Sequence, residues 1–428
     1  MSDVGAGTAS SDLAPGAAGG RRVPRGVHLA SESRGLPIPD VKVRCLEQAP
    51  DAVPLFARRR FAWNISELSG ALGDLGTFLP HIVAAITVVG MAPSGVLTMF
   101  GLFYLTTGAF FGVPMGVQPM KAASAAVLIQ HLEPGEIAAA GIVIGAFFLL
   151  LGATGVITRL AALVPPVLTA GIQLGLGLAL AALGVKLIGE QLWLGVVVAA
   201  LMLVLLNSSR FPAALVGIAA GVVLARVTGT GEPLPALQLG LHAPGFIWPT
   251  WPQMASGVEL AVLPQVPLTL TNAIIVTAAV TRQLFPKEVH PVNERNLAIT
   301  TGLGNLLAAP FGGYLMCHGA GGITGHYRFG ARTAAAPAII GLAFLSLGVL
   351  LGDSAMGLLK LIPQAAVGGL LFFSGIELAV SSKPQSYAGS DLFAVLLIGA
   401  ISVASNAAIA FAVGLPLAYA IRRGLVRL

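Results

Sequence analysis

Long stretches without a formal charge are the feature that most limits what this chain can fold into. Between Leu75 and Met120 there is no Asp, Glu, Lys or Arg. Three more uncharged runs follow at Ile137–Thr158, Thr333–Gly352 and Leu392–Ile421. A helix needs about 20 apolar residues to cross the hydrocarbon core of a bilayer. The runs therefore predict an all-α polytopic membrane protein and exclude an ordinary soluble domain.

Fourteen membrane segments can be placed after residue 60. Their predicted bounds are 65–89, 94–112, 113–130, 136–158, 163–185, 191–207, 211–227, 256–282, 293–309, 312–329, 333–352, 357–380, 391–405 and 407–425. Residues 1–60 mix nine basic and six acidic residues with Gly, Ala, Pro and Ser. Such a mixture cannot bury a core, so we expect a disordered cytoplasmic tail there.

The placement of basic residues tests this map. With the tail in the cytoplasm, fourteen crossings put 20 of the 24 Lys and Arg residues on the cytoplasmic side, as the positive-inside rule requires. Both termini are then cytoplasmic, and the membrane is the cell membrane if the chain is bacterial. The same bias explains the net charge of +6 without any nucleic-acid partner.

The chain contains an internal repeat with an offset of 198 residues. Pro165 aligns with Pro363, and Gly171 and Gly177 align with Gly369 and Gly375. The offset pairs segments that are seven apart in the map. Because seven is an odd number of crossings, the two halves, 61–227 and 256–428, would have opposite orientations in the membrane. Such a seven-plus-seven inverted repeat is the architecture of secondary transporters. Accidental alignment of apolar helices is the alternative.

The third and tenth segments are interrupted by glycine and proline at corresponding places. They contain Gly112–Pro119 and Pro310–Gly322. Paired interruptions of this kind indicate a transport site at mid-membrane. We expect half-helices that start near Pro119 and near His318 and Gly319, with Gly321 allowing close approach of the backbone. Each helix N-terminus carries about +0.5 of an elementary charge, so with Lys121 the site presents about +2, which suits a dianion.

Asp74, Gln118, Lys121 and His318 are the main polar candidates for this site, and the last three each have a structural alternative. Lys121 is a costly charge inside the membrane, and either a bound anion or a permanent salt bridge with Asp74 would compensate it. Gln118 can donate two hydrogen bonds to an anion or serve only in helix packing. His318 can donate to an oxyanion or carry a coupling proton, or be a satisfied buried histidine.

Other polar residues give weaker signals. Asn272 is the repeat counterpart of Asp74 and joins the predicted substrate site, whereas Glu377 is expected to lie away from it. His81 and His326 receive no role. No zinc-protease motif, nucleophile elbow or phosphate-binding loop is present, so we predict neither an enzyme, nor a metal site, nor a cofactor.

Four short motifs resemble the signatures of the molybdate transporter family, which is related to the SulP sulfate permeases. They are Gly73–Phe78, Val117–Ala122, Cys317–Gly322 and Tyr327–Arg332, and the likeness spans roughly residues 62–428. The resemblance implies the seven-plus-seven fold shared with uracil permeases, with a core and a gate domain. It places Gln118 and Lys121 in one signature and His318 in another. The family usually has proline where Gly116 and Leu315 stand here, and we expect no C-terminal STAS domain because the sequence stops at Leu428.

The leading functional hypothesis is a secondary active transporter of molybdate that works by alternating access. Sulfate and tungstate are alternatives, because charge and size hardly distinguish them from molybdate. A nucleobase–proton symporter of the same fold is a second hypothesis, weakened because Tyr314–Arg332 contains no Asp or Glu. A non-transport intramembrane protein is a third. A coupling proton and a homodimer are further expectations.

Overall fold

The computed structural model describes residues 61–206, 208, 211–236, 238–286, 291–352 and 354–425. The predicted tail, residues 1–60, lies outside these residues, as do three further basic residues assigned to the cytoplasmic side, Arg210, Lys287 and Arg427.

Both halves of the chain are helical and each contains one three-residue strand. The first half consists of α1 (Ile65–Thr87), α2 (Pro93–Phe111), β1 (Val117–Pro119), α3 (Lys121–Gln130), α4 (Pro134–Thr154), α5 (Ile157–Leu163), α6 (Pro166–Glu190), α7 (Leu192–Leu205) and α8 (Ala213–Val227). The second half begins with a continuous helical segment made of α9 (Trp251–Gly257), η2 (Val258–Val262), α10 (Leu263–Leu268), η3 (Thr269–Val276) and α11 (Thr277–Leu284). It continues with α12 (Glu294–Ala308), η4 (Ala309–Phe311), β2 (Met316–His318), α13 (Ala320–Arg328), α14 (Ala335–Ser346), η5 (Leu347–Leu351), α15 (Ser354–Lys360), α16 (Gln364–Ser381), η6 (Pro384–Ser386), α17 (Gly389–Ala404) and α18 (Ala407–Arg422).

Local signals in the sequence explain several of these boundaries. The side chain of Asn64 caps α1 by accepting a hydrogen bond from the amide of Glu67 at 2.9 Å. Helices α4 and α6 have Pro134 and Pro166 at the first position, where a missing N–H costs nothing. Helix α2 ends at Gly112 in the left-handed conformation, which glycine adopts without strain.

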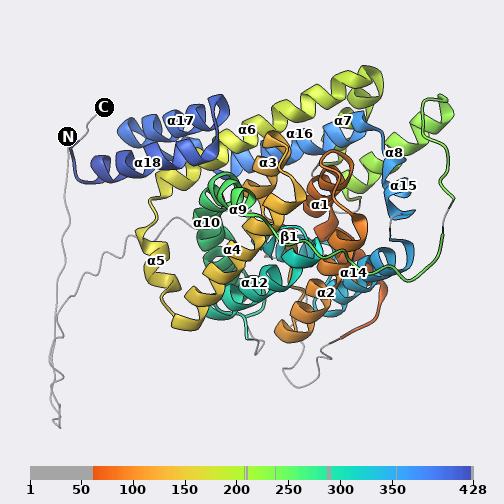
Figure 1. Ribbon diagram of the computed structural model, residues 1–428, viewed down its shortest axis with the longest axis horizontal. Helices are drawn as coiled ribbons and strands as arrows, with labels where there is room; N and C mark the ends of the chain where they lie inside the picture. The colour runs from red at the N-terminus through yellow and green to blue at the C-terminus, as the bar shows by residue number, and fades with distance from the viewer. Residues whose placement is uncertain are drawn as a thin grey trace, which may run out of the picture. The chain divides into compact units, whose positions relative to one another are not determined.

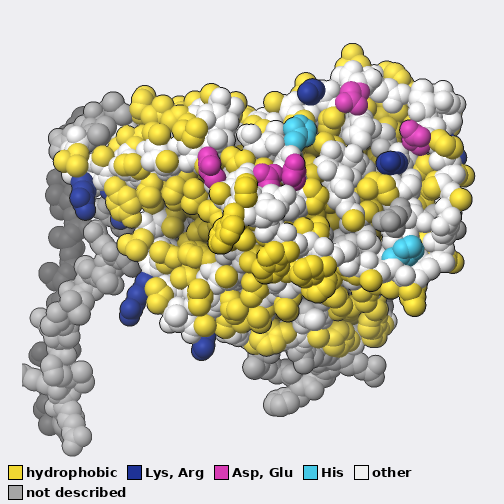
Figure 2. Space-filling model, viewed as in Figure 1, with side chains coloured by type: hydrophobic (Ala, Val, Ile, Leu, Met, Phe, Trp, Pro, Cys, Tyr) yellow, Lys and Arg dark blue, Asp and Glu magenta, His cyan; other side chains and the backbone are white. Residues whose placement is uncertain are grey.

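The helices are those of a multi-pass membrane protein. Among the described residues, six helical segments are long and apolar enough to span a bilayer, or seven if α14 and η5 together with α15 count as one bent span. Helices α7, α8, α17 and α18 are shorter apolar helices. Hydrophobic side chains cover most of the face shown in Figure 2, and charged side chains occur there only at a few places. The prediction of a helical membrane protein is therefore confirmed.

Elements of the two halves recur at the spacing of the sequence repeat. Shifted by 198 residues, β1 falls on Leu315–Cys317, next to β2, and α3 falls on Gly319–Arg328, next to α13. Helix packing is reciprocal in the same way: α2 packs on α14 and α4 on α12, while α6 packs on α17 and α7 on α16. The short helices α5 and α15 form a further corresponding pair, which the sequence analysis did not anticipate.

Two apolar clusters organise the described part of the chain. The first cluster is built mainly by α1, α2, α4, α12 and α14 around buried aromatic residues such as Phe78, Phe100 and Phe148. The second cluster is built mainly by α6, α7, α16, α17 and α18, with α8 at its edge. Helices α6 and α16 lie side by side (Figure 1) and pack on each other more extensively than any other pair.

Glycine allows that close crossing of α6 and α16. A Cβ atom on Gly177 would lie 2.6 Å from the carbonyl oxygen of Gly375, and one on Gly375 would lie 2.6 Å from that of Gly177. The two glycines are repeat counterparts. Their backbones are in contact, so any side chain there would force the helices apart.

Candidate functional site

The two interrupted segments meet as a short antiparallel pair of strands. Val117 lies opposite His318, Gln118 opposite Cys317, and Pro119 opposite Met316. Helix α3 begins two residues after β1, and α13 begins two residues after β2. Because the strands are antiparallel, the two half-helices leave the pair in opposite directions. The expected half-helices are thus present, and the strand pair between them was not foreseen.

Side chains of neighbouring helices fix the strands in place. The amide of Asn305 on α12 brackets β2, accepting from the Met316 N–H at 3.0 Å and donating to the Met316 carbonyl at 2.6 Å. The Val117 N–H donates to Asp74 Oδ2 on α1 at 3.2 Å. Extended backbone at membrane depth must be satisfied within the protein, and these bonds meet that need.

The first amides of each half-helix are donors without an intrahelical acceptor. In α3 the third amide, of Ala123, donates to Gln265 Oε1 on α10 at 2.9 Å. In α13 the first intrahelical bonds are made by Gly322 and Ile323 to the carbonyl of Gly319. The preceding N–H groups of both helices remain as positive helix ends, which favour an anion.

Gln118 joins α1 to the start of α13. Its Nε2 donates to Asp74 Oδ1 at 2.9 Å and to the Thr77 hydroxyl. Its side chain also lies so close to Gly319 that a Cβ atom there would collide with Gln118 Oε1, and it lies 3.7 Å from the Cβ position of Gly321. Gly319 is half-buried and Gly321 is exposed, so this amide borders the accessible end of α13.

Lys121 forms an ion pair with Glu377 on α16. The Nζ and Oε1 atoms are 3.6 Å apart, and the two side chains are 25% and 55% exposed. The expectation that Glu377 lies away from the site was wrong, because the packing of α16 on α1, which brings Glu377 to Lys121, could not be inferred from separate apolar segments. The pair joins α3 to the second cluster.

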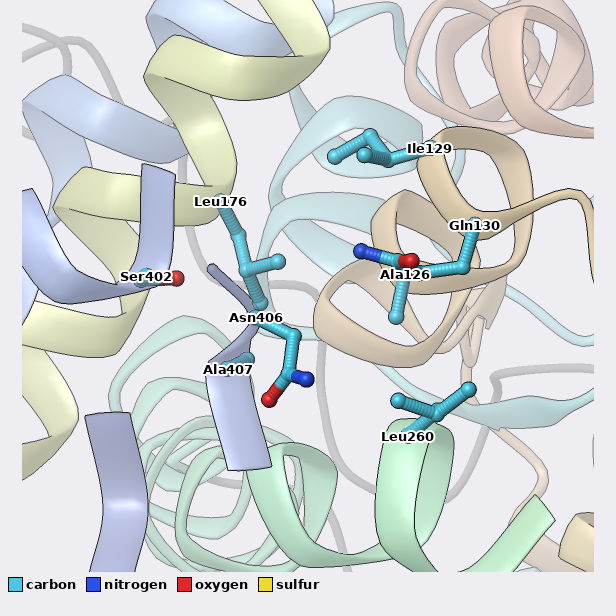
Figure 3. Close-up of a pocket in the computed structure, with 8 residues that line it drawn as sticks. All are labelled: Ala126, Ile129, Gln130, Leu176, Leu260, Ser402, Asn406 and Ala407. Carbon is cyan, nitrogen blue, oxygen red and sulfur yellow. The ribbon is translucent and has the colours of Figure 1, made fainter. Parts of the chain in front are cut away.

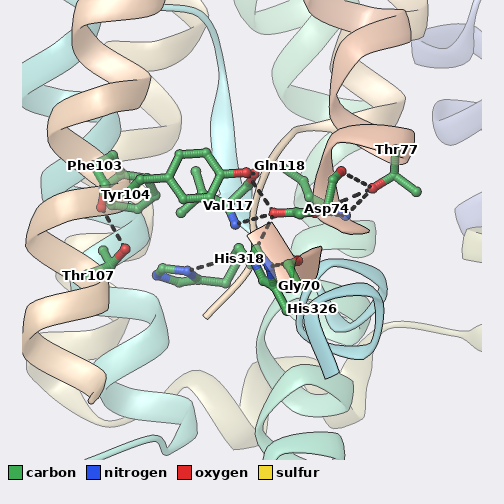
Figure 4. A network of polar contacts seen from close by, with 11 residues as sticks. Gly70, Asp74, Thr77, Phe103, Tyr104, Thr107, Val117, Gln118, His318 and His326 are labelled. Carbon is green, nitrogen blue, oxygen red and sulfur yellow. Dashed lines mark hydrogen bonds and ion pairs between the residues drawn. The ribbon is translucent and has the colours of Figure 1, made fainter. Parts of the chain in front are cut away.

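Asp74 is fully buried and has partners other than Lys121 (Figure 4). The Tyr104 hydroxyl of α2 lies 2.6 Å from Asp74 Oδ2, and Nε2 of His326 on α13 lies 3.5 Å from the same oxygen. The alternative of an Asp74–Lys121 salt bridge is therefore not realised. Tyr104 was not predicted from the sequence, and His326 had no predicted role. The position of His326 within the glycine-rich half-helix was the available signal for it.

His318 has partners on the side of α12. Its Nε2 is 2.8 Å from the Thr300 hydroxyl and its Nδ1 is 3.4 Å from the Gly116 carbonyl. The ring stacks on Phe103 with centroids 5.2 Å apart and meets the edge of Phe111 at 5.3 Å. Both ring nitrogens of His318 therefore already have partners, and the imidazole supports β2 on the side of α12. Gly319, the residue just before α13, follows His318 directly in the chain.

Asn272 lies on η3, the element that corresponds to the Asp74 region of α1 in the repeat. Its side chain is exposed and has no hydrogen-bond partner among the described residues, and its carbonyl accepts from the Thr277 hydroxyl at 3.0 Å. Segment η3 packs beside β2 and α13. Asn272 is therefore near the same broken segment, without sharing the Asp74 network.

A pocket elsewhere is a poor match for a charged ligand. It lies at the C-terminal half of α3 and is lined by Ala126, Ile129, Gln130, Leu176, Leu260, Ser402, Asn406 and Ala407 (Figure 3). None of these side chains is charged. The described residues also contain no group of three His, Cys, Asp or Glu side chains that could hold a metal ion. The helix ends at β1 and β2 remain the best candidate for an anion.

Comparison with known proteins decides the family. A family model described as "Molybdate transporter of MFS superfamily" matches residues 66–180 and 257–378, which include both broken segments. The chain belongs to the molybdate transporter family. Molybdate transporter 2 of Arabidopsis thaliana is 34% identical, with 82% of this chain and 86% of that protein covered. Molybdate transporter 1 of the same plant is 32% identical, with 83% and 87% covered. These relatives are transporters and not enzymes, as predicted.

Solved structures with a similar fold are anion transporters. The transmembrane domain of the cyanobacterial bicarbonate transporter BicA has a TM-score of 0.62 at 17% identity and covers 83% of this chain and 97% of its own. Murine Slc26a9, an anion transporter in the inward-facing state, has a TM-score of 0.63 at 14% identity, with 87% and 70% covered. This member of the molybdate transporter family therefore has a BicA-like helical membrane fold.

Proposed function

We propose that this protein is a secondary active transporter that carries molybdate across the membrane. Its substrate site would lie between the N-termini of α3 and α13, beside Gln118. The observation that carries this proposal is the pairing of β1 with β2, which brings two positive helix ends and Lys121 to one place. The names of its curated relatives point to molybdate, and sulfate and tungstate have the same charge and shape class.

Lys121 would bind the anion by giving up its ion pair with Glu377. A bound dianion and the Glu377 carboxylate compete for one ammonium, because a lysine at 3.6 Å from a half-exposed carboxylate is held only by about 1 kcal/mol or less. An oxyanion that also accepts hydrogen bonds from two helix ends would be held in the site more strongly than Glu377 holds Lys121. Binding would then release the Lys121–Glu377 contact.

Release of that contact suits alternating access, with the first cluster moving against the second. Among the described residues, two polar links join α16 to α1 and α3. One is the Lys121–Glu377 ion pair, and the other is His81, whose Nε2 is 2.8 Å from the Ser374 hydroxyl while its Nδ1 is 2.9 Å from Ser124. We propose that these clusters correspond to the expected core and gate.

The proposed architecture is a seven-plus-seven inverted repeat over 61–227 and 256–428. It is supported by the offset of 198 residues, the reciprocal helix packing and the antiparallel strands. The orientation with the basic loops in the cytoplasm agrees with contacts among the basic helix ends. Arg282 pairs with Glu294 at 2.7 Å, and Arg295 donates to the carbonyl of Gly152 at 3.3 Å, so the ends of α4, α11 and α12 share one side.

Uptake into proteoliposomes tests the function. Wild-type protein should accumulate labelled molybdate, and unlabelled tungstate or sulfate should compete if selectivity depends on charge and shape. Gln118→Ala should reduce uptake strongly, whereas Gln130→Ala, at the C-terminal end of α3, should not. Uptake of a nucleobase but not of molybdate would contradict the proposal.

A further inference from the structure

The buried cluster around Asp74 contains more acceptors than its hydrogens can satisfy. The Tyr104 oxygen lies 2.6 Å from Asp74 Oδ2 and 2.6 Å from the Val117 carbonyl. A phenol has one hydrogen, so it can donate along only one of these contacts. If Asp74 is ionised, the other contact places two acceptor oxygens at hydrogen-bond distance with no hydrogen between them.

His326 presents the same problem from the other side. Its Nδ1 lies 2.8 Å from the Gly70 carbonyl, and a carbonyl only accepts, so Nδ1 must carry a hydrogen. In the neutral ring Nε2 then carries only a lone pair. This buried nitrogen has no hydrogen bond within the described part of the chain and faces Asp74 Oδ2 at 3.5 Å. A lone pair directed at a carboxylate is repulsive.

One additional proton would remove either of these unfavourable contacts, the one at the Tyr104 oxygen or the one at His326 Nε2. On Asp74 Oδ2 it donates to the Tyr104 oxygen, and the phenol then donates to Val117. On His326 Nε2 it makes an imidazolium paired with the carboxylate. We propose that Asp74, Tyr104 and His326 form a proton-binding site that is coupled to the anion site through Gln118. This inference rests on the proposed function, since it concerns the same anion site.

Among the residues that the structure describes, few other charged groups near this cluster could take this proton or neutralise Asp74. The titratable side chains that face the cluster from the packed elements are Tyr104 on α2, His326 on α13 and Cys317 on β2. Lys121 on α3 pairs with Glu377 of α16 instead, and α14 carries no charged residue. Glu67, the other buried carboxylate of α1, is held by the amides of Arg332 and Thr333 at 2.8 and 3.0 Å.

Protonation would strengthen anion binding for two reasons. It removes a negative charge directly behind the anion site. It also weakens the bond from Gln118 Nε2 to Asp74 Oδ1, because hydrogen bonds to a carboxylate are about twice as strong as those to a neutral acceptor, and so frees a donor for the oxyanion. Linkage is reciprocal, so the anion must also favour proton uptake.

Molybdate binding to the purified full chain in nanodiscs tests the coupling. Calorimetry at one pH in buffers of different ionisation enthalpy should show proton uptake on binding. Between about pH 5 and about pH 8, the dissociation constant should rise with pH, by up to about tenfold per pH unit for one linked proton. Asp74→Asn, which mimics the protonated acid, should abolish both effects. Glu67→Gln, the matched buried carboxylate, should keep both.

The outcomes separate the coupling from the function. Absence of molybdate binding at any pH would defeat the proposed function itself. Binding without proton uptake and without pH dependence would overturn the coupling while leaving the function intact, as would an Asp74→Asn protein with wild-type proton uptake. If Asp74→Asn does not fold, Tyr104→Phe and His326→Gln take its place. Tyr104→Phe removes the acceptor of the proton on Asp74, and His326→Gln removes the proton position on the histidine, so unchanged pH dependence in both would overturn the assignment.

Discussion

Removing the carboxylate of Glu377 should tighten anion binding, because Glu377 and the anion compete for Lys121. The Nζ and Oε1 atoms are 3.6 Å apart, and two unit charges at that distance attract by about 1 kcal/mol in water and by about 5 kcal/mol at an effective dielectric constant of 20. Since the side chains are 25% and 55% exposed, the lower value applies, and measured exposed pairs agree with it. Glu377→Gln should therefore lower the molybdate dissociation constant by about fivefold.

Lys121→Ala should have the opposite and larger effect. Loss of a hydrogen bond from a charged donor costs about 1.5–3 kcal/mol, which weakens binding by about ten- to a hundredfold. In the Lys121→Ala background, Glu377→Gln should change nothing further, because the carboxylate acts only through the ammonium. Such non-additivity is the signature of two residues in contact.

Equilibrium binding of molybdate to the four proteins of this cycle is the assay, with folding checked by thermal unfolding. Glu190→Gln, an exposed acid at the end of α6, is the matched control for a change in net charge. The reasoning is refuted if Glu377→Gln leaves the affinity unchanged, or if it tightens binding equally with and without Lys121.

Three further predictions follow from the packing. Gly319→Ala should displace the Gln118 amide, since the new methyl group would collide with it, and should weaken molybdate binding in a protein that still folds. Gly177→Ala should lower the thermal stability by about 1–3 kcal/mol because its Cβ would strike the backbone of α16, whereas Gly189→Ala, with no atom within 4 Å, should not. Asn305→Leu should cost about 1–3 kcal/mol by leaving one N–H and one carbonyl of β2 unpaired; thermal unfolding measures it, and an unchanged midpoint would contradict it.

Hydropathy along the chain was sufficient for the class of protein and for most helices. The predicted segment 65–89 became α1 (Ile65–Thr87), and 211–227 became α8 (Ala213–Val227). Hydropathy predicts these helices because every backbone N–H and C=O group in a bilayer must be hydrogen-bonded within the protein. A sufficiently long apolar segment meets this requirement by forming a helix. The glycine and proline interruptions marked the broken segments for the same reason.

The partners of the site residues depended on the tertiary structure. Lys121 meets Glu377 from 256 positions away, and Asp74 meets His326 from 252 positions away. Which side of a membrane helix faces which neighbour depends on packing between small residues, and a nearly uniform apolar sequence leaves that rotation undetermined. The sequence alone therefore determined that this protein is a helical transporter with paired broken segments near Gln118. Only the packing of α1, α13 and α16 decided which carboxylate pairs with Lys121 and which histidine pairs with Asp74.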